Sequence, residues 1–183
     1  MRAVAGKTRR HSGWVWQVVA VPAVLVLILS LAVNWYAGRE GTRRGQLFSE
    51  LADLHVAALA STNPVDVVST DRHTVKPWFQ GKIPFTFNLP ELQGSDFILL
   101  GGRVTYLAQT PGAQLIYQLR KHEISVFIFQ DRGGETEGLP LGRNHALTFN
   151  VESWIRNGLR YFVIGDVAAD DIARLSKLLR DAG

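Results

Sequence analysis

The stretch QLIYQLRKHEISVFIFQ, residues 114–130, decides the fold because apolar side chains recur at every second position on both sides of a short polar break. These side chains are Leu115, Tyr117 and Leu119 before the break, then Ile124, Val126 and Ile128 after it. A period of two is typical of a strand with one face against a core. We therefore predict two antiparallel strands, 114–120 and 124–130, joined across residues 121–123.

Similar patterns predict further strands on both sides of this hairpin, at residues 65–69, 83–88, 97–109, 145–156 and 159–166. Gly101-Gly102 interrupts the long strand 97–109, which indicates a bulge or a close approach of another backbone. Residues 110–113 form a turn signal, and Asn157-Gly158 is the strongest short hairpin signal in the chain. Residues 71–82, with Pro77 suited to opening a helical turn, and the glycine-rich residues 131–143 are expected to be irregular.

Amphipathic helices are predicted before and after this strand region. The first, residues 39–62, ends at Asn63-Pro64, and its apolar stripe is Leu47, Leu51, Leu54 and Ala58, widened by Phe48, His55 and Leu59. The second, residues 168–181, has acids in its first turn and bases near its last, as the helix dipole prefers, and its stripe is Ile172, Leu175 and Leu179. The sequence therefore predicts an α+β fold, an antiparallel β-meander sheet packed by a juxtamembrane helix and a C-terminal helix. A dimerising role for the helix at 39–62, which would give a homo-oligomer, is the alternative.

The excess positive charge of the chain lies entirely in its first thirteen residues. The formal net charge is +4, and residues 1–13 contain Arg2, Lys7, Arg9 and Arg10 without an acid, so the rest of the chain is balanced. No charged residue follows until after Gly38, and residues 14–36 are apolar, with aromatic residues at both ends. About 20 apolar helical residues cross a bilayer core of about 30 Å, and Trp and Tyr prefer its interfaces.

We therefore predict an uncleaved signal anchor in the bacterial cytoplasmic membrane, with the C-terminal domain outside. The chain would comprise a short basic cytoplasmic tail (1–13), a transmembrane helix (14–36), a juxtamembrane helix (37–63) and an extracytoplasmic α+β domain (64–183). A cleaved signal peptide and a buried helix of a soluble protein are the alternatives. Since residues 14–183 are neutral overall, no nucleic-acid partner is expected.

Enzyme chemistry has no signature in this sequence. Cysteine is absent, which excludes thiolate metal sites and cysteine nucleophiles, and no phosphate-binding, hydrolase or metalloprotease motif is present. We therefore expect a protein that is not an enzyme and has no cofactor. His55, His73 and His122 could converge on a metal beside a carboxylate such as Asp71, although their spacing matches no ligand motif. The alternative is a set of surface or hydrogen-bonded core histidines.

The segment HTVKPWFQGK, residues 73–82, combines unusual residue types in a short space. Trp78 and Phe79 beside Lys76 and Lys82 could form an aromatic, basic recognition patch. The alternative is that both aromatic rings fill the core while the lysines remain in solvent.

The same segment carries a family resemblance. Residues 69–82, STDRHTVKPWFQGK, resemble the extracytoplasmic domain of bacterial transmembrane anti-sigma factors of the zinc-finger-headed group. Residues 97–106, FILLGGRVTY, are similar to a second motif of that group, and the resemblance continues through residues 50–68, 118–129 and 153–179, about 135 residues in all. It implies a sensor or interaction domain, with Asp71, His73, Lys76, Trp78, Phe79 and Arg103 as residues that contact a partner or signal.

The cytoplasmic zinc-binding head of that family has no counterpart in this sequence. Its H-x-x-x-C-x-x-C motif holds the sigma factor, whereas this chain has no cysteine and only thirteen residues before the apolar span. The true start could lie upstream, the head could be a separate chain, or the domain could serve sensing or assembly alone. The expected partners are the membrane and either a sigma factor or a second membrane protein. The alternative functions are a metal-binding unit and a structural accessory subunit of a membrane complex.

Overall fold

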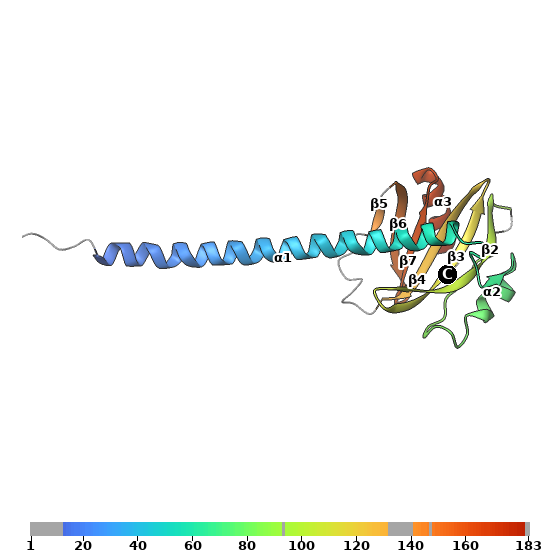
Figure 1. Cartoon of the computed structure of the whole chain (residues 1–183), viewed down its shortest axis with the longest axis horizontal. Coiled ribbons are helices and arrows are strands. Elements are labelled where there is room, and N and C mark those ends of the chain that lie inside the picture. The colour runs from blue at the N-terminus through green and yellow to red at the C-terminus, as the bar shows by residue number, and fades with distance from the viewer. Residues whose placement is uncertain (1–12, 93, 132–140, 147, 182–183) are drawn as a thin grey trace, which may run out of the picture. The chain divides into compact units, whose positions relative to one another are not determined.

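The computed structural model describes the backbone of residues 13–92, 94–131, 141–146 and 148–181, and their side chains except those of 13–25 and 39–44. The fold is α+β, as predicted (Figure 1). The helices are α1 (Gly13–Leu59), α2 (Arg72–Trp78) and α3 (Ala169–Asp181). The strands are β1 (Val67–Val68), β2 (Phe97–Leu107), β3 (Thr110–Leu119), β4 (His122–Gln130), β5 (Gly142–Ala146), β6 (Phe149–Arg156) and β7 (Leu159–Gly165).

The strands of the described chain form one antiparallel sheet in the order β1-β2-β3-β4-β7-β6-β5. The first four strands are a meander, as predicted. The prediction of a meander throughout is wrong, because the chain leaves β4 for the far edge and returns through β6 to pair β7 with β4. Residues 124–129 and 162–165 are buried, so this order keeps the two most apolar strands away from the sheet edges.

Two of the predicted turns and strands differ in the structure. The turn after β2 is Ala108-Gln109, with φ of 46° and 65°, and the predicted turn residues 110–113 belong to β3. Pro111 is tolerated in this strand because the β4 ladder begins only at Gly112. The predicted strand 145–156 is divided into β5 and β6, which form a hairpin of their own.

Other local predictions are confirmed. The Asn157-Gly158 turn has φ of 51° and 72°, the conformation that a tight hairpin requires. The Gly101-Gly102 interruption is both a register shift in β2 and a close backbone approach: a Cβ on Gly101 would lie 2.0 Å from the Val67 carbonyl oxygen.

Residues 83–88 form no strand, although their alternation is real. Ile83 and Phe87 are buried and Phe85 is half-buried, while the residues between them are exposed. These apolar side chains pack on the core, but their backbone pairs with no strand. An alternation of period two therefore does not by itself predict a strand here. The predicted irregular segment 131–143 lies mostly outside the described residues.

The two largest hydrophobic clusters among the described residues lie on the two faces of the sheet. On the first, here called the α1 face, the last turns of α1 lie across the sheet (Figure 1). Leu47, Leu51 and Ala52 of α1 pack there against a group of aromatic residues from the sheet. On the second, the α3 face, α3 and α2 cover the larger apolar core, which includes Val75, Leu115 and the predicted α3 stripe Ile172, Leu175 and Leu179. The predicted stripe of the first helix is also largely confirmed, except that Leu59 is 43% exposed.

The chain divides between Arg43 and Arg44 into two units, and the boundary falls within α1. Among the described residues, no helix is both long enough and apolar enough to cross a membrane. The predicted tail, residues 1–13, and the side chains of the first half of the predicted span lie outside the described part, apart from the backbone of Gly13.

Candidate partner-binding groove

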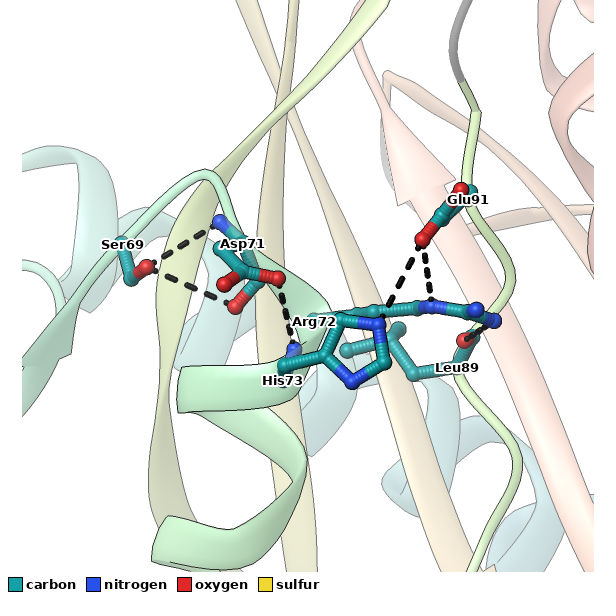
Figure 2. A network of polar contacts seen from close by, with 6 residues as sticks. All are labelled: Ser69, Asp71, Arg72, His73, Leu89 and Glu91. Carbon is teal, nitrogen blue, oxygen red and sulfur yellow. Dashed lines mark hydrogen bonds and ion pairs between the residues drawn. The ribbon is translucent and has the colours of Figure 1, made fainter.

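The start of α2 is fixed by the acidic residue of the STDRH motif. Asp71 is the N-cap residue, and its carboxylate accepts a hydrogen bond of 2.8 Å from the backbone N–H of His73 (Figure 2). The Asp71 N–H donates in turn to the Ser69 hydroxyl oxygen at 3.0 Å. The expectation that residues 71–82 are irregular is wrong for their first half, which forms α2. Pro77 does not open this helix, because Asp71 caps it and Pro77 lies in its final turn.

A polar network ties α2 to the segment that follows residue 88. Arg72 Nε lies 3.0 Å from Glu91 Oε1, and His73 Nε2 lies 3.5 Å from the same oxygen (Figure 2). Arg72 Nη1 also donates to the Leu89 carbonyl oxygen at 3.4 Å. All three side chains of this network are more than a third exposed, so it orients the two segments and contributes at most about 1 kcal/mol to stability.

Two hollows flank Arg72. The first, which we call the edge groove, has a volume of about 430 Å³ and lies between the start of α2, the residues on both sides of position 93, the first half of β2 and Tyr117 of β3. The second hollow, of about 390 Å³, is lined by Arg72, His73, Lys76, Pro77, Asn88 and Leu89. The first turn of α2, which carries part of the motif at residues 69–82, therefore separates two concave surfaces.

The structure separates the residues that the sequence had grouped as partner contacts. Asp71 lines the edge groove, whereas His73 and Lys76 are exposed and line the second hollow. Phe79 is 2% exposed and packs edge-on against Phe87, so it belongs to the core.

Trp78 and Arg103 complete that group. Trp78 is half-buried against the α3-face core, and the Lys82 ammonium lies 4.4 Å from its ring centroid. Both aromatic residues thus follow the core-filling alternative. Arg103 pairs in register with Gln114, and its side chain occupies an α1-face position, on the other side of the sheet from α2.

The three candidate metal ligands occupy separate environments. His55 lies on the buried side of α1, His73 is exposed on α2, and His122, at the start of β4, has its Nδ1 3.1 Å from the Asp166 carboxylate. Within the residues that the structure describes, no group of three histidine or acidic side chains could hold a metal.

His55 instead completes a hydrogen-bonded cluster between α1 and the sheet. Its Nδ1 lies 2.8 Å from the Ser125 hydroxyl, which also accepts from Gln114 Nε2 at 3.1 Å. Since that hydroxyl accepts from Gln114, its own proton can be donated to His55 Nδ1, and the imidazole is then neutral with its proton on Nε2. Burial lowers the pKa of His55 to about 4, an effect that the negative charge of Asp166 partly opposes.

Tyr117 is the most unusual polar group near the edge groove. The side chain is 1% exposed, and its hydroxyl finds no hydrogen-bond partner among the described residues. Burial raises the pKa of this phenol, so it stays protonated at any physiological pH. An unpaired buried hydroxyl costs about 1–3 kcal/mol and requires an explanation.

Sequence reasoning missed three of the polar residues that line the edge groove: Arg72, Glu91 and Tyr117. Arg72 lies inside the motif that the sequence had singled out, but Glu91 is 19 positions away in an irregular segment. Tyr117 was interpreted only as one member of an alternating strand, because period alone does not reveal an unpaired hydroxyl.

Comparison with known proteins adds no family assignment, since no family model matches the chain and no curated protein matches it either. The resemblance to anti-sigma factors therefore stays a prediction.

Proposed function

We propose that this chain is a single-pass bacterial membrane protein without enzymatic activity, whose extracytoplasmic domain binds a partner or signal in anti-sigma-type regulation of transcription. The apolar stretch 14–36 anchors it, with the basic tail in the cytoplasm. The sensor domain comprises the last turns of α1 and everything after them.

The observation that carries the proposal is the exposure of a continuous apolar helical surface. The large apolar side chains from 26 to 36 are each 57–70% exposed: Val26, Leu27, Ile28, Leu29, Leu31, Val33, Trp35 and Tyr36. Val26 to Leu29 are four successive residues that span a full helical turn, and the others follow within two turns, so apolar side chains cover every side of the helix. This suits a lipid environment better than a one-sided protein contact. The residues before them, 14–25, continue the same composition.

Partner binding is supported by the position of the groove. Two of the domain's concave surfaces, the edge groove and the second hollow, lie around α2, where the STDRHTVKPWF segment is found. Regulation would follow if a partner favoured one of two arrangements of the domain on α1, because a ligand shifts an equilibrium only by its difference in affinity for the two states.

Membrane anchoring is tested by alkaline extraction of membranes from cells that express the full chain. We expect the protein to stay in the membrane pellet and to need detergent for release. Each arginine in the middle of a span costs about 2.5–3.5 kcal/mol, so the double variant Leu27→Arg/Leu31→Arg should shift to the soluble fraction. Leu59→Arg, at an exposed position outside the span, is the matched control and should stay in the pellet. A wild-type protein released by alkali contradicts the anchoring.

The regulatory role is tested by transcript profiling of a strain from which the gene is deleted. An anti-sigma role predicts that one set of genes sharing a promoter motif rises several-fold, and that His73→Ala, at an exposed position, fails to respond to the signal while remaining folded. A deletion without such a set, combined with a stable stoichiometric membrane partner on purification in detergent, would favour a structural accessory subunit instead.

A further inference from the structure

The outer edge of β2 is only partly covered. β1 is two residues long and pairs with Gly101 and Gly102 alone. Two further hydrogen bonds extend that contact, from Asp66 N–H to the Gly102 carbonyl at 2.9 Å and from Ser69 N–H to the Leu100 carbonyl at 3.2 Å. The chain then turns away at Thr70 and Asp71 into α2, which leaves Phe97, Ile98 and Leu99 beyond the end of β1.

The hydrogen-bonding register of the β3–β4 hairpin determines which backbone groups of β2 point outward from this sheet edge. Leu119 and His122 are paired across a two-residue turn, so they exchange both backbone hydrogen bonds and the Leu119 groups face β4. Phe97 is the β2 partner of Leu119, so its own N–H and C=O point away from β3. Leu99, two residues further along, has the same orientation.

These outward groups are largely unpaired. The Phe97 N–H donates to the Ser95 hydroxyl at 3.3 Å, but no described residue bonds to the Leu99 N–H or C=O across the outer edge. Phe97, Ile98 and Leu99 all line the edge groove, so the open backbone faces a hollow that is already shaped.

This edge also lacks the usual protection against strand addition. Natural edge strands carry lysine, proline or inward-pointing charges at such positions, whereas the stretch here is Phe-Ile-Leu. Ile98 is 51% exposed, while Phe97 and Leu99 are 4% and 8% exposed. An apolar edge without such residues is a liability unless something pairs with it.

The unpaired Tyr117 hydroxyl lies beside the same stretch. Tyr117 is the direct register partner of Leu99, and its side chain belongs to the α3-face core that continues into the groove. A side chain that enters the groove next to Leu99 would supply the hydrogen-bond partner that the hydroxyl lacks. Arg72 and Glu91 already pair with each other at the rim, so the entering side chain would be neutral.

We propose that the edge groove binds an extended peptide segment of a partner protein, which adds a strand to β2 at Phe97–Leu99 and places one neutral hydrogen-bonding side chain beside Tyr117. This mode of recognition draws affinity from backbone hydrogen bonds and specificity from the pocket for alternate side chains. The proposal rests on the partner-binding role proposed above, and it adds the place and the chemistry of the contact.

The test uses the full chain in detergent micelles and a phage-displayed library of linear peptides as the probe. Peptides enriched on the wild type are synthesised, and their dissociation constants are measured by fluorescence anisotropy. The native chain has no cysteine, so Ile98→Cys and Tyr106→Cys each carry a single thiol that a bulky maleimide can modify. Both side chains are exposed on β2, at 51% and 59%, but only position 98 lies in the groove.

We expect modification at position 98 to weaken peptide binding at least tenfold and modification at position 106 to leave it within twofold. Alternate N–H groups of an added strand point toward β2, and those between them point away. N-methylation of the first set of peptide nitrogens should therefore abolish binding, and N-methylation of the second set should spare it. Tyr117→Phe should weaken peptides with a polar central side chain more than those with an apolar one.

Two results would overturn the proposal: no enrichment of any peptide, or enriched peptides that bind equally well after modification at position 98. Neither result depends on the membrane. If no peptide binds but the chain stays in the membrane after alkaline extraction, the groove proposal is wrong and the membrane anchor stands. If peptides bind but the chain is released by alkali, the anchor is wrong and the groove proposal stands.

Discussion

The two faces of the sheet are built differently, and the difference separates stability from recognition. The α1 face has the smaller core: aromatic rings from three strands, β4, β6 and β7, meet the helix. Its buried polar cluster of His55, Gln114 and Ser125 is joined by hydrogen bonds, although His55 Nε2 has no partner among the described residues. The α3 face has the larger apolar core, yet its border at α2 opens into the edge groove and contains an unpaired tyrosine. One face holds the helix on the sheet, and the other has room for a partner.

The tightest part of the α1 face gives the largest expected effect. A Cβ on Gly112 would lie 2.3 Å from the Phe129 ring and 2.6 Å from the Ile128 carbonyl oxygen. Gly112→Ala should therefore lower the free energy of unfolding by about 3–4 kcal/mol, since a ring and a backbone atom must both move. On the opposite face, a Cβ on Gly102 would meet only side chains, at 2.8 Å and beyond, so Gly102→Ala should cost about 1–2 kcal/mol.

Urea denaturation of both variants checks this order. An equal loss, or a larger loss for Gly102→Ala, would show that the α1 face is no tighter than the other.

The buried histidine predicts a pH dependence that belongs to the α1 face. The folded-state pKa of His55 is about 4 and its unfolded value is 6.5, so between these values the unfolded chain binds more protons. The His55 contribution is thus fully present above about pH 6.5 and is lost as the pH falls toward 4, by about 3 kcal/mol in all.

The measurement is the free energy of unfolding from pH 8 to pH 4, compared with that of His55→Gln. The difference between the two proteins should show the decline, while His122→Gln should retain it. Parallel curves for the wild type and His55→Gln would contradict a buried neutral imidazole.

The N-cap of α2 tests how strongly the start of this helix, which lines the edge groove, is stabilised. Asp71→Ala removes the acceptor of the His73 N–H and should cost about 1 kcal/mol. Asp71→Asn keeps an acceptor at the same position and should cost only a few tenths of that. Thermal unfolding resolves the two variants, and equal melting temperatures would mean that the cap does not stabilise the start of α2.

The smallest expected effect has the opposite sign. Tyr117→Phe removes a buried hydroxyl without a partner and keeps the ring, so it should leave the free energy of unfolding unchanged or raise it by up to about 1 kcal/mol. A loss of more than 1 kcal/mol would show that the hydroxyl is already satisfied in the free protein, and the groove would lose its polar determinant.

Local sequence patterns predicted most elements of the fold and little of the site. Period-two alternation found β3 and β4, and Asn157-Gly158 found the β6–β7 hairpin, because each depends on neighbouring residues. The pairing of β4 with β7 could not be predicted, since it depends on which strands are buried on both faces. The edge groove depends on where β1 stops and on the contact of Arg72 with Glu91, and no local pattern encodes either.

Labelling of single cysteines in intact cells tests the central claim of a membrane-anchored sensor most directly. Thr8→Cys lies in the basic tail, and Asn63→Cys is exposed just after α1. We predict that a membrane-impermeant maleimide modifies Asn63→Cys in intact cells and modifies Thr8→Cys only after the membrane is permeabilised. Protection of both positions, or labelling of position 8 alone, would contradict the account.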